Sequence, residues 1–588
     1  MPVGPGDEAG GPIEVVVKAD GSIVDNTGLV AVDIEHRVNR IARAVLVYDD
    51  GAQGFRDFPL TDAATFEPGT QIDVEAGYGG GPKTEVFTGV VVAERLTIGD
   101  GGEVRLRVEC RHRAVAMTLT RRNAVRRDVK DSEVIRTLFA AANLACSVSA
   151  TEAMLREVVQ HDATDWDFAV TRAEANGLVV LAQAADVRIV APDATQEPVL
   201  RVTYGLDLIR FEGLVDARDQ QPNAVAVTWS PAEQTLSQRN AAALPLARSG
   251  PGNLSPKQLA DALAQEDVRL QSAALDLASL EPWAKGRQLR AALSANRARL
   301  VFAGSGRAAI GDTIELHNLG NRFGGRAFVG AVMHRIEAGE WLTTVETGLD
   351  VLTHSDLHRL TSPAAAGLTA PIQGLQLGVV QKLEDDPDGQ HRVMVSLPLL
   401  GDDQPGVWAR LAQAYASNGF GAFVLPEIGD EVVLGFFDDD PSAPVVLASL
   451  YSANRPPPFS FEDANDTKAL VTRTEMKVTF DEAKKVITVT TPAGNRAILD
   501  DEQKTVTLKD ETGNVVELSP RGIKLSSPGD ITLEAKGNIE ATAQMDATVK
   551  GLNVTADAQV GVTAKGGASA ELSAAGNTTV KGAMVMIN

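Results

Sequence analysis

Few residues of this sequence have the types and spacing that catalysis or metal binding requires. His354 and His358 stand four positions apart in His-Ser-Asp-Leu-His, which is a ligand-like spacing. A zinc site needs more ligands than two, and the sequence contains no His-Glu-x-x-His motif. We therefore interpret the two histidines as a polar end of a β-rich unit, with a metal site as the alternative.

Three further groups of residues could do chemistry. The Gly-rich segment 79–84 resembles a phosphate loop, but Pro82 breaks the required spacing, which favours a hairpin turn. The aspartates at 438–440 could bind a cation with help from other ligands, although an exposed loop explains them as well. Cys110 and Cys146 are too few for a disulfide framework and are expected to be two buried thiols. We expect no catalytic residue, no cofactor and no metal.

The segment 121–127, Arg-Arg-Asn-Ala-Val-Arg-Arg, is a basic run in an acidic chain. Our preferred interpretation is a solvated link before a helix that begins near Glu133. The alternative is a surface that docks onto an acidic partner.

Charge and hydropathy restrict the class of protein. The net charge of the 588 residues is −23, which disfavours binding to nucleic acid or to an anionic membrane. The start of the sequence has no basic patch and no apolar core of a signal peptide, and no run of eighteen apolar residues is present. We expect synthesis and assembly in the cytoplasm, even if the protein is released later.

The elements that carry these residues are mainly β-strands. We expect two β-barrels with an α/β insertion and a helical segment, then a small OB-type barrel, then a repetitive β-structure. Within the insertion, Thr164 and Gly177 are the expected N-cap and stop of a helix. Residues 255–300 are expected to be largely helical, and 421–425 is one expected strand of the small barrel. The predicted boundaries are a flexible arm at 1–12, first barrel 13–125, insertion 126–215, second barrel 216–360, linker 361–377, OB barrel 378–455, connector 456–470 and β-helical segment 471–588.

The C-terminal stretch repeats every eight residues or so, with short strands that alternate between apolar and polar positions. One strand buries too few apolar side chains to offset its ordering cost of about 1–2 kcal/mol per residue. We therefore expect a β-helix or β-prism built from several identical chains; the alternative is a disordered tail. The residues expected in its core are Val515, Ile523, Leu525, Ile531, Leu533, Ile539, Val549, Val554, Val562, Leu572 and Val580.

Several motifs resemble VgrG and phage baseplate spike proteins. The segments Phe-Val-Leu-Pro-Glu-Ile-Gly-Asp-Glu-Val-Val at 423–433 and Asp-Pro-Ser-Ala-Pro-Val-Val-Leu-Ala-Ser-Leu-Tyr at 440–451 resemble the family's OB domain. Gln-His-Asp-Ala-Thr-Asp-Trp-Asp-Phe at 160–168 and His-Arg-Ile-Glu-Ala-Gly-Glu-Trp at 334–341 resemble its hub domain. The chain end, Val-Lys-Gly-Ala-Met-Val-Met-Ile-Asn at 580–588, is similar to its spike tip.

This resemblance implies a non-catalytic homotrimer that adapts a six-fold inner tube to a three-fold needle and punctures a target envelope. The core residues above would then be a trimer core. The implied partners are a PAAR-type tip protein, inner-tube and baseplate proteins, and effector cargo, with the target membrane contacted only on firing and no nucleic acid bound. The implied tip-partner interface is Met584, Val585, Met586, Ile587 and Asn588.

Two departures from the family pattern shape the expected function. The connector after Tyr451 is too short for a lysozyme domain, and the sequence has no effector after the needle, so a spike of an extracellular or phage-tail-like contractile particle is expected. The alternatives are a cell-wall or polysaccharide hydrolase with a β-solenoid, and a receptor-binding tail-fibre adhesin.

Overall fold

The computed structural model describes residues 3–7, 10–51, 57–183, 185–241, 250–273, 275–401 and 404–587, without the side chain of Leu400. The chain divides into two compact units, Met1–Ser449 and Leu450–Asn588. Strands greatly outnumber helices in both, which confirms the mainly β prediction. Among the described residues no helix combines the length and hydrophobicity that crossing a bilayer would require.

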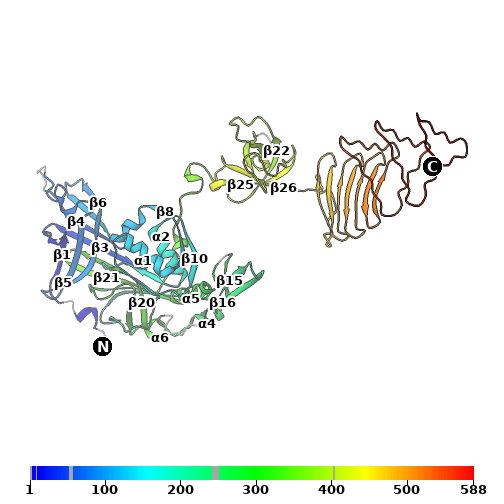
Figure 1. The fold of residues 1–588 in the computed structure, drawn as a ribbon. Coiled ribbons are helices and arrows are strands. Elements are labelled where there is room, and N and C mark those ends of the chain that lie inside the picture. Colours follow the sequence, from blue (N-terminus) through cyan, green and yellow to red (C-terminus); the bar gives the residue numbers. More distant parts are fainter. Residues whose placement is uncertain are drawn as a thin grey trace. The chain divides into compact units, whose positions relative to one another are not determined.

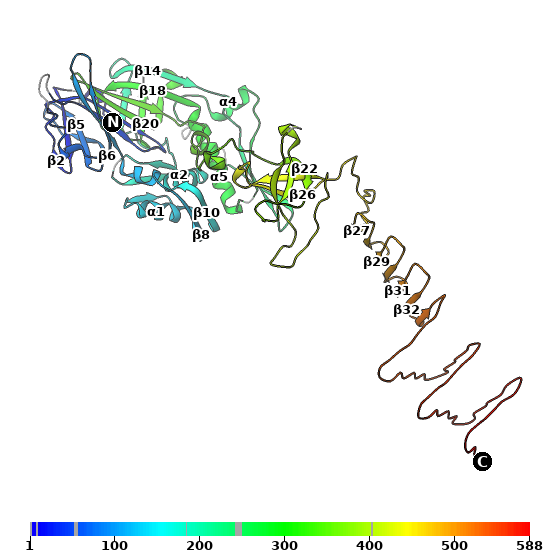
Figure 2. The same ribbon diagram turned by 90° about the horizontal axis from the view of Figure 1, so that it is seen from above.

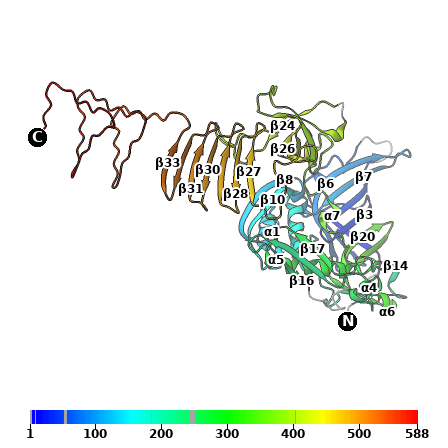
Figure 3. The ribbon, with the colours of Figure 1, turned by 90° about the vertical axis from the view of Figure 1, so that its right-hand side faces the viewer.

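One long sheet dominates the first unit (Figures 1, 2 and 3). The order of its main path is β14 (Leu208–Val215), β18 (Asn296–Ala303), β21 (Glu340–Thr347), β20 (Gly325–Glu337), β3 (Leu29–Arg37), β4 (Arg43–Asp49), β7 (Val104–Arg111), β6 (Thr84–Ile98), β5 (Gln71–Tyr78), β1 (Ile13–Ala19) and β2 (Ser22–Ile23). A branch adds β19 (Thr313–His317), which pairs with β20, and β13 (Leu200–Thr203), which pairs with β19. The two predicted barrels thus share one continuous sheet, because β3 and β20 pair directly.

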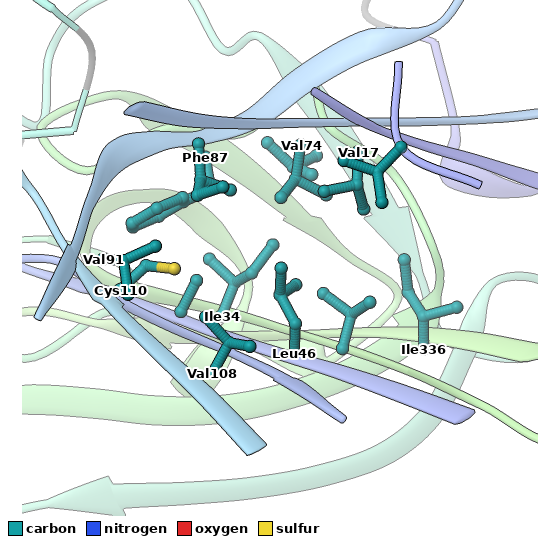
Figure 4. Packing of buried hydrophobic residues seen from close by; sticks show 14 of the residues in the cluster. Val17, Ile34, Leu46, Val74, Phe87, Val91, Val108, Cys110 and Ile336 are labelled. Atoms are coloured by element: carbon teal, nitrogen blue, oxygen red, sulfur yellow. The ribbon is translucent and has the colours of Figure 1, made fainter. Parts of the chain in front are cut away.

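Two hydrophobic cores lie against this sheet. The first contains Phe87, Leu46 and Ile336, and Figure 4 shows these side chains converging from several strands. The second contains Val332 and neighbouring residues of β18, β19 and β21. Val332 and Ile336 lie four positions apart on β20 and therefore on the same face, so both cores use one side of the sheet.

The described residues of the predicted arm at 1–12 contact the first unit. The carbonyl of Val3 accepts a hydrogen bond from the backbone N–H of Arg201 at 3.2 Å. Pro5, in the short helix η1 (Pro5–Asp7), is buried. This hydrogen bond can form because the edge of β13 presents backbone groups that can pair with another segment. Residues 1, 2, 8 and 9 of the predicted arm lie outside the described residues.

An α/β layer follows the first core. It contains α1 (Asp131–Ala141), α2 (Asp165–Ala175), β9 (Cys146–Val148), β11 (Val179–Leu181) and β12 (Val187–Val190), with β8 (Arg121–Lys130) and β10 (Met154–Thr164) forming a separate ribbon. The Thr164 hydroxyl accepts from the Asp167 N–H at 3.0 Å, and Gly177 has a φ of 68°, which confirms both predicted helix ends. The basic run at 121–127 is strand β8, so the predicted solvated link is wrong; the run is ordered by pairing with β10.

The segment predicted to be largely helical is mixed. It contains α4 (Pro256–Ala262), β17 (Val268–Ser272), α5 (Leu277–Ser294) and the start of β18. The prediction fails at β17 because that strand pairs in parallel with β15 (Ala224–Ser230), a long-range contact that local periodicity does not encode. The remaining strand of this sheet is β16 (Thr235–Asn240). Short helices elsewhere in the first unit are η2 (Ala64–Phe66), η3 (Arg113–Thr118), α6 (Gly320–Phe323), α7 (His354–Leu357), η4 (Ala364–Gly367), η5 (Pro398–Leu400) and η6 (Phe437–Asp439).

The small barrel is closed, as an OB-type barrel requires. Its strands are β22 (Gln376–Lys382), β23 (Val393–Ser396), β24 (Val407–Leu411), β26 (Pro444–Ser449) and β25 (Glu431–Phe436). The predicted strand at 421–425 is wrong, because this segment has only one isolated bridge, between Ala416 and Gly421. The expected linker is partly anchored as well, since the N–H of Ile372 donates to the carbonyl of Asp439 at 2.8 Å.

The second unit begins with a sheet of seven antiparallel strands, each paired with the next (Figures 1 and 3). These are β27 (Thr467–Val471), β28 (Lys477–Asp481), β29 (Val486–Thr490), β30 (Arg496–Asp500), β31 (Thr505–Lys509), β32 (Val515–Ser519) and β33 (Gly522–Ser526). The strands begin at Thr467, inside the predicted connector. From 527 to 587 the described chain has no strand; the short strands predicted there require neighbouring copies of the chain and remain a prediction.

Candidate functional site: the uncovered face of the C-terminal sheet

The turns of the seven-stranded sheet recur with a spacing of nineteen residues, which is one pair of strands. Asp481 and Asp500 occupy equivalent turn positions, and their carboxylates accept backbone hydrogen bonds from Lys484 at 2.9 Å and from Gln503 at 2.7 Å. At the opposite edge, Gly494 and Gly513 have φ angles of 99° and 98°, which glycine adopts without strain. These equivalent turns keep successive strands in register.

The register places the larger apolar side chains on one face. Successive strands place Phe480, Ile487, Leu499, Val506, Leu518 and Ile523 directly opposite one another, as a first row. A second row, two positions away on the same face, consists of Leu470, Val478, Val489, Ala497, Leu508, Val516 and Leu525. Lys468, opposite Phe480, is the charged exception at the first strand. We call these two rows the apolar face.

The other face of the same sheet is mainly polar. Its central row is Ala469, Thr479, Thr488, Ile498, Thr507, Glu517 and Lys524. Threonine and charged residues suit a face that remains in water, as in sheets with one buried and one solvated side. The sheet therefore has the residue pattern of a structure with a covered side.

Nothing in the described chain covers that side. No described residue of the second unit is buried, and the members of both rows are half-buried or exposed. A large apolar side chain contributes about 1.5–3 kcal/mol when it is fully buried. Burying the two rows against a partner would therefore stabilise the sheet considerably. An exposed apolar area of this extent marks an interaction surface.

The predicted core residues do not all lie on the apolar face. Ile523 and Leu525 belong to the apolar face, whereas Val515 pairs with Lys509 and Ser526 and lies on the polar face. Val515 was predicted to lie in the core together with Leu525. This prediction is wrong, because Val516 is the residue on the same face as Leu525. The remaining predicted core residues are exposed and lie beyond the last strand: Ile531, Leu533, Ile539, Val549, Val554, Val562, Leu572 and Val580.

The sequence interpretation missed most of the apolar face. It concentrated on residues after 515, whereas both rows begin with β27 and β28. The signal was available in the nineteen-residue spacing of Asp481 and Asp500, and in the alternation of apolar residues within each strand. At the chain end, Met584, Val585, Met586 and Ile587 are exposed, and Asn588 lies outside the described residues.

The candidates for chemistry lie apart from this face in sequence and belong to the first unit. His354 is buried, with Nε2 at 2.8 Å from Oδ1 of Asp167 on α2, and the His354 and His358 rings lie 4.6 Å apart. His354 thus anchors α7 to α2 and is more than a polar end of a β-rich unit. Within the described residues no cluster of three or more His, Cys, Asp or Glu side chains could hold a metal ion.

The remaining candidates for chemistry are the two cysteines, the glycine-rich segment and the aspartates of the small barrel. Cys110 is a buried free thiol, as predicted, whereas the free thiol Cys146 is only half-buried and packs against a different core; burial raises their pKa values to about 12 and about 11. The glycine-rich segment forms the turn between β5 and β6, as predicted. Asp438 and Asp439 lie in η6 of the small barrel.

Comparison with known proteins gives two family matches. Residues 10–338 match the family described as "Alg8 N-terminal domain". Residues 376–451 match the family described as "Type VI secretion system/phage-baseplate injector OB domain".

Individual relatives match shorter segments. The type VI secretion system spike protein VgrG4b of Pseudomonas aeruginosa is 39% identical over 70 residues, which are 12% of this chain and 8% of the relative. The actin cross-linking toxin VgrG1 of Vibrio cholerae is 30% identical over 82 residues, which are 14% of this chain and 8% of the relative. The chain thus matches less than a tenth of the length of either. Among solved structures, the E. coli c3393 protein, a component of the type VI secretion system, superposes with a TM-score of 0.38 and 11% identity over 74% of this chain and 99% of its own.

Proposed function

The chain belongs to the Alg8 N-terminal domain family and is a VgrG-like baseplate spike protein, and on this basis we propose that three copies assemble into a hub with a needle. The relationship to spike proteins indicates a structural role. In the proposed assembly the first unit forms the hub and the second unit forms the needle. The hub connects a six-fold tube to the three-fold needle, and the needle punctures the target envelope.

The observation that carries this proposal is the apolar face. Three copies of the sheet, each turning this face toward a common axis, would bury both rows and leave the threonine-rich face in water. A two-layer packing of only two copies would also bury one face. We prefer three-fold closure because closed rotational symmetry covers every copy of the face and agrees with the trimer that the resemblance to spike proteins implies.

The interior residues of the proposed needle follow from the register. In β27 to β33 they are the two rows of the apolar face, with Val516 and Leu518 in place of the predicted Val515. Beyond 526, the predicted residues from Ile531 to Val580 would gain backbone partners from the other two copies. An extended chain with unpaired N–H and C=O groups readily pairs with identical neighbours.

The proposed partners follow from the two ends of this assembly. A PAAR-type tip protein would cover Met584, Val585, Met586, Ile587 and Asn588, because exposed apolar side chains favour a protein partner over water. Inner-tube and baseplate proteins would contact the hub, and effector cargo would travel with the particle. The target membrane would be contacted only when the needle is driven outward.

Electron microscopy of the purified full chain tests this proposal. The expected images have a broad three-fold ring with a single narrow rod. A set of single globular particles without a rod, at a concentration at which the chain is folded, would rule the proposal out. Binding of a candidate tip protein to the full chain, compared with a chain that lacks 580–588, tests the proposed tip contact separately.

A further inference from the structure

The ribbon of β8 and β10 has no assigned role in the proposed assembly. Its two strands, ten and eleven residues long, pair antiparallel (Figure 2), and among the described residues β8 pairs with no strand other than β10. One long edge of β8 therefore carries backbone groups that no other strand satisfies. Such an edge is a ready template for an additional strand.

One side of the ribbon is fixed to the hub. Val158 and Gln160 of β10 are buried, and the Gln160 amide donates to the Asp165 carboxylate of α2 at 2.9 Å. Arg126 of β8 lies over the Phe168 ring of α2, with 5.9 Å from its guanidinium carbon to the ring centroid. These contacts make the ribbon a rigid platform.

The other side of the ribbon is apolar at its centre and open to solvent. Val125 and Val159 are directly opposite each other in the register, and the two residues are 59% and 53% exposed. Such a cross-strand valine pair usually packs against another layer. Here the pair is uncovered within the described chain.

The strand that carries Val125 is rich in positive charge. The strand β8 contains five Lys or Arg residues and one carboxylate, in a chain that has 55 Lys and Arg against 78 Asp and Glu. Arg127 is exposed and lies 3.5 Å from the exposed Glu157, whereas Arg122 lies 3.2 Å from Asp165, which is buried on the hub side of the ribbon. An ion pair as exposed as that of Arg127 contributes about 0–1 kcal/mol, so Arg127 remains available to a new partner.

We propose that the β8–β10 ribbon is a docking surface for an extended, acidic segment of another protein. The segment pairs with the free edge of β8, places one apolar side chain beside Val125 in the row that Val159 continues, and places a carboxylate beside Arg127. Charge complementarity selects an acidic occupant, because a basic segment would face the densest positive charge of an otherwise acidic chain.

The test uses a labelled synthetic peptide of alternating valine and glutamate, about eight residues long to match a strand. Its binding to the full-length protein is measured by fluorescence anisotropy at low and high salt, and hydrogen exchange locates the contact. We expect binding that weakens with salt, protection of amides in β8, and a loss of affinity of about tenfold or more in R127E. The charge-matched control R335E, altered at an exposed position of β20, should bind as the wild type does.

Three outcomes would overturn the proposal. The first is no binding and no protection at about 1 mM peptide, the weak end of specific affinities. The second is equal binding of a peptide of alternating valine and lysine. The third is a change in the molecular mass of the protein caused by R127E, since that would identify a second copy of this chain as the occupant. Because the peptide assay does not depend on the number of chains, its failure is separable from failure of the proposed needle.

Discussion

Ile487 of β29 and Leu499 of β30 are directly opposite each other in the register, yet the two residues are 37% and 46% exposed. A cross-strand pair of this kind normally packs beneath a second layer. The same relationship recurs along the whole sheet, so the exposure belongs to a continuous face and not to one defect. The predictions below follow from this face and from the buried polar groups of the hub.

The first prediction concerns the two sides of β30. Leu499→Asp places a carboxylate on the apolar face and should abolish association of the chains, because an unpaired charge would have to be buried. Ile498→Asp changes the neighbouring residue, also apolar, on the polar face and should leave association intact. Size-exclusion chromatography with light scattering distinguishes the two, and equal behaviour of both variants would contradict the assignment of faces.

The second prediction concerns Glu174, which is almost fully buried in the hub. Its carboxylate forms an ion pair with Arg290. It also accepts hydrogen bonds from the side-chain amide of Asn39 at 2.7 Å and from the backbone N–H of His354 at 2.8 Å. Glu174→Ala leaves the buried Arg290 without its partner and should lower the free energy of unfolding by about 3–5 kcal/mol. The control Glu197→Ala removes the exposed partner of Arg326 and should cost less than about 1 kcal/mol. Denaturant unfolding measures both, and similar losses would refute the buried role of Glu174.

The third prediction concerns pH. Burial lowers the pKa of His36 to about 4 and that of His334 to about 3, from an ordinary value of 6.5. Below pH 6.5 the unfolded chain binds protons that the folded hub does not, so stability is fully present above this pH and falls as the pH drops toward 4. Each histidine makes the free energy of unfolding change by up to about 1.4 kcal/mol per pH unit in this range.

Denaturant midpoints at pH 7 and pH 5 check this dependence. His334→Gln should reduce the difference between the two pH values, and His317→Gln, at an exposed position of β19, should not. Stability that rises on acidification in this range would show that the two buried imidazoles do not control it.

The fourth prediction concerns Gly330 in β20. A Cβ atom at this position would lie 2.2 Å from the carbonyl oxygen of Gly348, which is backbone and cannot move aside cheaply. Gly330→Ala should therefore destabilise the hub by about 1–3 kcal/mol. Gly435→Ala is the control, since its nearest contact is a Leu447 side-chain atom at 3.4 Å. Thermal unfolding followed by circular dichroism compares them, and an unchanged midpoint for Gly330→Ala would contradict the close approach of these strands.

The sequence predicted the ends of a helix correctly where a single residue has a well-defined local role, such as a cap or a turn. Thr164 and Gly177 set the ends of α2 through a cap and a left-handed turn, both of which are local effects. The prediction failed at β17 and at β8, because these strands exist through pairing with β15 and β10. The face of Val515 was misassigned for a related reason: a shift of one residue reverses every side chain of a strand, and only the register with β31 and β33 decides it.

The molecular mass of the full-length protein in solution tests the central claim most directly. If the apolar face is covered by identical copies around one axis, light scattering or sedimentation will give three times the chain mass of 62.0 kDa, and Leu499→Asp alone will reduce it to the mass of one chain. A stable, folded wild-type protein with the mass of a single chain, its apolar face still in water, would contradict the account.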